Sequence, residues 1–196
     1  KVRPQLCLDP VKSVLYSSIN DNGTEHGEII EDKVVEGKYT GKIKAGTTLV
    51  IDLGQNMVGW EKVTIKGKKN TTVTFRFGEM LNDSGAVSRG NDGPKGSIYT
   101  ANYRTAKATG QYIMKGAKEG ETYRPNFTFF GFRYVEITAD KDINLIDFKA
   151  EFVSSDMTET GFVETSSDDV NKLISNVFWG RRCNYLSVPA DCRQRD

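Results

Sequence analysis

The last twelve residues hold an unusual concentration of side chains that could do chemistry. Four charged residues lie within six positions, directly after a predicted helix and a proline: Asp191, Arg193, Arg195 and Asp196. Carboxylates accept hydrogen bonds from hydroxyl groups, and guanidinium groups donate them to oxygen atoms. The pattern is typical of a site for a polyhydroxylated ligand. The alternative is an ion-pair network that fastens a junction between domains.

The rest of the sequence offers few other candidates for catalysis. Its single histidine, His26, lies in a polar, acidic stretch, where a solvated loop residue is the simpler interpretation. Phosphate-binding, nucleophile-elbow and zinc-protease motifs are all missing from the sequence. Pairs of carboxyl groups remain, and glycoside hydrolysis needs one such pair, with the two groups about 5–5.5 Å apart for retention or about 6.5–9.5 Å apart for inversion. The sequence alone does not identify such a pair.

The composition excludes several functional classes. The chain has 27 basic and 26 acidic residues, so its net charge of +1 favours neither nucleic acid nor anionic lipid. No apolar run has the length of a membrane span. The three cysteines lack C-x-x-C spacing and the sequence has a single histidine, so we expect no structural zinc, no other metal and no cofactor. Cys7, Cys183 and Cys192 are expected as free thiols, with a Cys183–Cys192 bridge as the alternative.

Residues 45–163 alternate between apolar and polar side chains. One example is the run in which Val73, Phe75 and Phe77 fall on the same face of a strand. Glycine and asparagine bound most of these runs, as turns require. Roughly eight to ten such strands without a strand–helix–strand rhythm predict a mainly β fold, an antiparallel β-sandwich. Residues 1–44 are expected to form lead-in strands and a polar loop.

The period changes in residues 164–196, where a single helix is predicted. Ser166 or Ser167 can cap it, and the two aspartates that follow suit the positive end of the helix dipole. Gly180 is the expected end, with continuation toward Asn184 as the alternative. One helix cannot bury its apolar stripe by itself, so a partner is expected in the sandwich or in a further helical domain. The stripe consists of Val170, Leu173, Ile174, Val177 and Phe178.

Three further segments carry expectations. Residues 52–60 are expected to be a tight turn between two strands, with Trp60 as core filler, although their composition also suits a specificity segment. Residues 80–96 form a long polar loop, and loops of that length are often functional, so it is the candidate for the rim of an active site. Residues 97–103 are expected to be a short strand.

The order of five motifs resembles the bacterial inverting α-L-rhamnosidases, glycoside hydrolase family 78. Together the motifs run in family order over residues 45–196. They are DLGQNMVGW at 52–60, FRFGEML at 75–81, YRTAKATGQY at 103–112, FTFFGFRYVEI at 127–137 and VPADCRQRD at 188–196. Two positions depart from the family pattern, because Ala190 stands where the family often has threonine and Arg193 where it usually has proline.

The resemblance implies a concanavalin-like (jelly-roll) sandwich followed by a helix that begins an (α/α)6 catalytic barrel. It implies an enzyme that removes terminal α-L-rhamnose from glycosides or polysaccharides by inverting hydrolysis. By motif position, Asp191 and Arg195 would hold the sugar, with Arg193 and Asp196 supporting them. The general acid is expected just after Asp196 and the base further along the barrel. No catalytic acid or base is therefore expected within the chain, which should be inactive by itself.

The implied partners are a rhamnose-containing glycan and the protein's own catalytic barrel, with no nucleic acid and no membrane. The beginning and end of the sequence suggest a segment of a longer protein, which leaves the compartment open between periplasm or exterior and cytoplasm. A different class of function is a stand-alone carbohydrate-binding β-sandwich, in which Trp60 or exposed aromatic rings stack on sugars. A structural spacer that positions the barrel is compatible with the enzyme interpretation.

Overall fold

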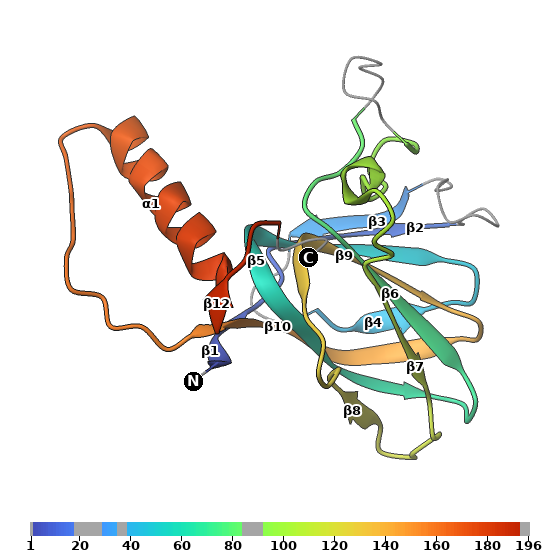
Figure 1. The fold of residues 1–196 in the computed structure, drawn as a ribbon. Coiled ribbons are helices and arrows are strands. Elements are labelled where there is room, and N and C mark those ends of the chain that lie inside the picture. The colour runs from blue at the N-terminus through green and yellow to red at the C-terminus, as the bar shows by residue number, and fades with distance from the viewer. Residues whose placement is uncertain (1, 18–28, 35–38, 84–91, 193–196) are drawn as a thin grey trace.

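The computed structural model describes residues 2–17, 29–34, 39–83 and 92–192. In these ranges the chain forms twelve strands, one long helix and a short 3-10 turn (Figure 1). The elements are β1 (Val2–Leu8), β2 (Lys12–Tyr16), β3 (Ile29–Val34), β4 (Gly41–Ile43), β5 (Thr48–Gly67), β6 (Thr72–Gly78), η2 (Ala101–Tyr103), β7 (Thr109–Ile113), β8 (Glu121–Tyr123), β9 (Phe130–Ala139), β10 (Ile143–Ser155), α1 (Asp168–Cys183), β11 (Tyr185–Leu186) and β12 (Val188–Pro189).

Ten of the strands form one antiparallel sheet in the order β1-β10-β5-β9-β6-β7, to which β2, β3, β4 and β8 attach laterally. The long strand β5 connects its parts. The first half of β5 pairs with β2 and β9, whereas the second half pairs with β10 and β8. The prediction of a mainly β, antiparallel fold is confirmed.

The core follows the predicted alternation of side chains. Val73, Phe75 and Phe77 of β6 are all 0% exposed. The ring of Phe77 stacks on Phe130 of β9 at a centroid distance of 4.0 Å and meets Phe132 at 4.9 Å. Burying each such side chain contributes about 1.5–3 kcal/mol, so the aromatic residues of β6 and β9 are a main source of stability.

The expected turn at residues 52–60 is wrong, because β5 continues through it. Its pairing with β9 shifts register between Asp52 and Met57, and this bulge accommodates the turn-forming residues. Gly54 adopts a left-handed φ of 73°, and its N–H donates to Asp52 Oδ1 at 2.7 Å. Met57 is fully buried just beyond, so the segment remains a strand. Trp60 is only half-buried and is not core filler.

The expected strand at residues 97–103 is also wrong. Ile98 makes an isolated bridge to Leu81, and the chain then enters η2. The side chain of Asp92 competes with strand pairing here, because it accepts hydrogen bonds from the backbone N–H and hydroxyl of Thr100 at 2.8 and 2.7 Å. These bonds fix the base of the long polar loop. Its residues 84–91 lie outside the described residues, as does His26.

Strands that precede residue 45 join the same sheet, since β1 and β4 pair with β10 and β2 pairs with β5. Helix α1 follows a linker and stands away from the sandwich (Figure 1). Ser167 caps it by accepting from the N–H of Val170, as predicted. The helix passes through Gly180 and ends at Cys183, with Asn184 as its C-cap. Within the described ranges, no helix is both long and apolar enough to cross a membrane.

Candidate functional site

The segment that carries Asp191 follows a tight hairpin, which is held by hydrogen bonds at its turn and at its base. Strands β11 and β12 pair around Ser187, whose φ of 72° is left-handed. The N–H of Ser187 donates to Ser155 Oγ at 2.8 Å, which ties the hairpin to the end of β10. The N–H of Ala190 donates to the carbonyl oxygen of Asn184 at 2.7 Å. The chain just before Asp191 is thus fixed to both the sandwich and the helix.

Asp191 itself is exposed at the end of this hairpin. The thiol of Cys192 donates to its Oδ2 at 3.6 Å, a weak hydrogen bond that leaves the carboxylate able to accept from a ligand. Arg193, Arg195 and Asp196 lie outside the described residues, so their approach to Asp191 stays a prediction.

None of the three cysteines forms a disulfide in this structure. Cys183 is fully buried at the end of α1, Cys192 is half-buried and Cys7 is exposed. The Cys183–Cys192 bridge that the sequence left open is therefore not formed. The burial of Cys183 joins the end of the helix to the core of the sandwich.

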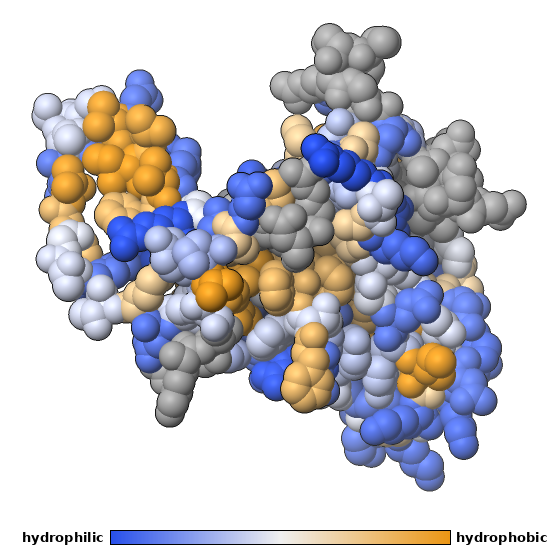
Figure 2. Space-filling view, viewed as in Figure 1, coloured by the Kyte–Doolittle hydropathy of each residue, from blue (hydrophilic) through white to orange (hydrophobic). Residues whose placement is uncertain are grey.

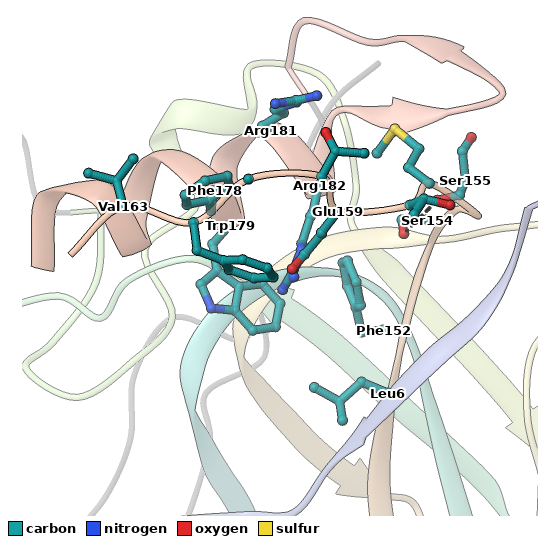
Figure 3. A pocket seen from close by; sticks show the side chains of 15 residues that line it. Leu6, Phe152, Ser154, Ser155, Glu159, Val163, Phe178, Trp179, Arg181 and Arg182 are labelled. Carbon is teal, nitrogen blue, oxygen red and sulfur yellow. Dashed lines mark hydrogen bonds and ion pairs between the residues drawn. The ribbon is translucent and has the colours of Figure 1, made fainter. Parts of the chain in front are cut away.

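Aromatic and ionic contacts fasten the C-terminal half of α1 to the sandwich (Figure 3). Trp179 meets Phe152 of β10 edge to face, with ring centroids 5.2 Å apart and an interplanar angle of 68°. Arg182 forms an ion pair with Glu159 of the linker, and its guanidinium lies 5.8 Å from the Trp179 ring centroid. Arg181 lies over Tyr185 at 6.0 Å. These contacts fix where the hairpin begins.

A cavity of about 660 Å³ lies between the end of β10, the linker and α1. Apolar side chains such as Leu6, Phe152 and Phe178 line it, and arginines border it (Figure 3). Glu159 is the one carboxylate among its lining residues, and it is ion-paired. An acid/base pair for hydrolysis is therefore not found in this cavity. Among the described residues there is also no cluster of His, Cys, Asp or Glu that could hold a metal ion.

The outer face of α1 and the linker beside it expose large apolar side chains. Leu173 and Val177 are each 62% exposed, and Phe162 of the linker is 83% exposed. Figure 2 shows the apolar surface over α1. The sequence predicted that this stripe needs a partner. Nothing in the described part of the chain covers Leu173 and Val177.

Three buried acids escaped the sequence analysis: Glu61, Glu136 and Glu151, which are 0%, 1% and 5% exposed. Glu136 pairs with Arg76 at 3.1 Å across neighbouring strands. The burial of Glu61 could have been predicted, because the alternation along β5 places it on the same face as the apolar Val63. The partners of the other two come from strands distant in sequence, which no local pattern reveals.

Glu151 is the centre of a charged cluster around Trp60. Trp60 Nε1 donates to its Oε2 at 2.8 Å, Arg124 Nη1 lies 3.2 Å from the same oxygen, and Lys62 Nζ lies 3.4 Å from Oε1. The guanidinium of Arg124 also lies over the Trp60 ring, 5.4 Å from its centroid. Arg124 thus covers one face of the Trp60 ring, and Glu151 holds its indole N–H. These contacts give Trp60 a structural role.

The comparison with protein families matches most of the chain from residue 42 onward. The bacterial alpha-L-rhamnosidase concanavalin-like domain matches residues 42–154. The bacterial alpha-L-rhamnosidase 6 hairpin glycosidase domain matches residues 158–196. The chain belongs to the bacterial α-L-rhamnosidase family. The resemblance found in the sequence is thereby confirmed, as is the concanavalin-like fold of the sandwich.

The curated α-L-rhamnosidases that this chain matches are much longer than the chain. An alpha-L-rhamnosidase of Streptomyces avermitilis is 44% identical over 148 residues, which are 75% of this chain and 13% of the relative. One from Formosa agariphila is 36% identical over 184 residues, 92% of this chain and 18% of the relative. The chain thus spans less than a fifth of either relative.

Solved structures of α-L-rhamnosidases share the fold. The Streptomyces avermitilis enzyme complexed with L-rhamnose matches with a TM-score of 0.69 and 34% identity, over 99% of this chain and 15% of that one. The enzyme from Dictyoglumus thermophilum matches with a TM-score of 0.72 and 28% identity, over all of this chain and 18% of that one. The helix and hairpin thus have counterparts together with the sandwich.

Proposed function

We propose that this chain is the part of an α-L-rhamnosidase that joins the β-sandwich to the catalytic barrel and presents one side of the sugar-binding site. The observation that carries the proposal is the junction between the two family domains. One domain match ends at residue 154, near the end of β10, and the other begins at residue 158, in the linker to α1. The parent enzyme would remove terminal α-L-rhamnose from glycosides or polysaccharides.

In this proposal Asp191 and Arg195 bind the sugar. The exposed carboxylate of Asp191 would accept hydrogen bonds from rhamnose hydroxyls, and its position on an anchored hairpin limits the entropy lost on binding. Arg195 would supply positive charge to the site, and Arg193 and Asp196 would orient these two groups. A hydrogen bond to a charged group contributes about 1.5–3 kcal/mol, so losing Asp191 should be costly.

The proposed reaction is a single displacement with inversion. A carboxylic acid protonates the leaving oxygen while a carboxylate activates water on the opposite face of the sugar. Both groups would come from parts of the parent enzyme outside these 196 residues. The chain by itself should not hydrolyse rhamnosides.

The partner of the apolar face of α1 would be the remaining helices of the catalytic barrel. Leu173 and Val177 are the most exposed members of the stripe. Burying each of these side chains against the barrel would contribute about 1.5–3 kcal/mol to the stability of the parent enzyme. The sandwich would then act as a fixed support for the first helix and hairpin of the barrel.

Proton NMR of the parent enzyme acting on an aryl α-L-rhamnoside tests the proposed reaction. The first sugar released should be the β-anomer, which then equilibrates with the α-anomer. Initial release of the α-anomer, or no release of rhamnose, would contradict the proposal. Titration of the isolated chain with rhamnose tests the alternative of a binding module. We expect no heat of binding there, since Trp60 is engaged by Arg124 and Glu151.

A further inference from the structure

Glu61 of β5 is a carboxyl group inside the sandwich core. Its side chain is 0% exposed, and it points away from Trp60 and Lys62, which flank it in the strand. In the sheet it pairs with Ala150 of β10. On the facing side its Oε1 lies 3.7 Å from where a Cβ on Gly110 of β7 would stand. The carboxyl group is therefore buried in the sandwich, with β10 beside it in the sheet and β7 on the facing side.

No other described residue donates a hydrogen bond to either oxygen of Glu61. The titratable group that faces it from β8 is Tyr123, whose pKa is raised by burial and by the charge of Glu61. From β7, the hydroxyl of Tyr112 donates to Glu121 instead. On β10, Glu151 is engaged on the other face of the sheet by Trp60 and its cations. None of these groups offers a positive charge to Glu61.

We propose that Glu61 is a neutral carboxylic acid in the folded protein and that it makes the β-sandwich progressively less stable as the pH rises. An ionised carboxylate without a cation or donor is strongly disfavoured in an apolar interior, so the group keeps its proton instead. Burial raises the pKa of Glu61 to about 8, and the residue's own backbone N–H offsets only part of this effect. The sandwich thereby carries a pH-sensitive point in its core.

The direction of the pH dependence follows from the pKa of Glu61 in the unfolded and in the folded chain. In the unfolded chain the carboxyl group loses its proton near pH 4.5, whereas in the folded chain it keeps the proton up to about pH 8. Between these values the unfolded state binds fewer protons, so stability falls with rising pH. The equilibrium constant for opening should rise about tenfold per pH unit, or roughly 10³-fold in all. Below and above this window Glu61 adds no further pH dependence.

Hydrogen exchange of the full-length parent protein tests this proposal, because peptides from β5 and β10 report the opening of the sandwich alone. The variant Glu61→Gln keeps the size of the side chain but cannot ionise. Protection of wild type and Glu61→Gln should differ by no more than a few-fold near pH 5, and near pH 8 the variant should be roughly 10³-fold better protected. The control Glu119→Gln removes an exposed acid and should match wild type throughout. A ratio that stays constant with pH would overturn the proposal.

Infrared spectroscopy of the wild type is a second test that needs no variant to fold. A protonated carboxylic acid has a carbonyl stretch distinct from that of a carboxylate. At neutral pH the protein should show this band, and it should disappear as the pH rises through about 8. Its absence at neutral pH would also overturn the proposal.

Discussion

The indole of Trp179 meets the ring of Phe152 edge to face, and this contact joins α1 to the sandwich. Phe152 is 3% exposed at the end of β10, and Trp179 lies one turn before the helix ends at Cys183. The C-terminal half of α1 is therefore fixed, while its N-terminal half, which carries the exposed Leu173, stands clear of the sheet (Figure 1). The position of Asp191, eight residues after Cys183, depends on this junction.

A double-mutant cycle measures the energy of this contact. Unfolding of the single and double variants of Phe152→Leu and Trp179→Leu in denaturant should give a coupling of about 0.5–1.5 kcal/mol, as is usual for aromatic pairs. As a control, Trp179→Leu combined with Phe75→Leu in the core should be additive within about 0.5 kcal/mol. Additivity of the first pair would show that the ring contact contributes nothing.

Gly59 should tolerate no side chain. A Cβ on it would lie 2.0 Å from the carbonyl oxygen of Glu151, so the backbones of β5 and β10 would have to separate. Gly59→Ala should destabilise the protein by more than about 4 kcal/mol or prevent folding. Gly180→Ala is the matched control, because that position in α1 is open and alanine favours helix by about 0.5–1 kcal/mol. Equal thermal unfolding of wild type and Gly59→Ala would refute the close approach.

Trp60→Phe should destabilise the protein at neutral pH and less so in acid. Burial alone would raise the pKa of Glu151, but hydrogen bonds from Trp60 and Arg124 and the charge of Lys62 outweigh it and lower the pKa. A lowered pKa contributes stability above the unfolded value near 4.5, and the contribution is lost as pH falls through the folded value. Losing this donor should cost about 1.5–3 kcal/mol near neutral pH.

Urea unfolding of wild type and Trp60→Phe across pH checks this assignment. The difference between the two proteins should shrink as the pH falls below about 4.5. A difference that does not change with pH would mean that the tryptophan acts through packing alone.

A charge introduced on the apolar face of α1 should affect the stability of the isolated chain and that of the parent enzyme differently. Leu173→Lys should change the unfolding of the isolated chain by less than about 0.5 kcal/mol, because the side chain is exposed there. In the parent enzyme it should cost about 2–3 kcal/mol if the face packs on the barrel. Ser175→Lys, an exposed position on the polar side of the helix, should be neutral in both. Equal effects of Leu173→Lys in the two proteins would contradict the packing.

Much of the fold could be predicted because its signals are local. Period-two alternation identified β6 and its buried face, and a serine followed by acids identified the start of α1 at Asp168. The turn chemistry of residues 52–60 was misleading, because a bulge can accommodate Gly54 and its neighbours while Met57 stays buried. The helix passed Gly180 because the contacts of Trp179 and Cys183 extend its packing by one turn.

The candidate site could be predicted only in part. The exposed position of Asp191 agrees with a ligand-binding role, but the bond between Ser187 and Ser155 that anchors its hairpin joins residues distant in sequence. The same applies to the cluster around Glu151, whose cations come from other strands. The spacing of residues along the sequence does not reveal contacts of this kind.

The measurement that tests the central claim most directly is the kinetics of Asp191 variants in the parent enzyme. With an aryl α-L-rhamnoside, Asp191→Asn and Asp191→Ala should each lower kcat/KM by roughly 10²-fold or more, because sugar hydroxyls lose a charged acceptor. Asp169→Asn, an exposed acid in the first turn of α1, is the matched control and should retain wild-type kcat/KM. Wild-type kcat/KM in both Asp191 variants would contradict the assignment of Asp191 to the sugar-binding site.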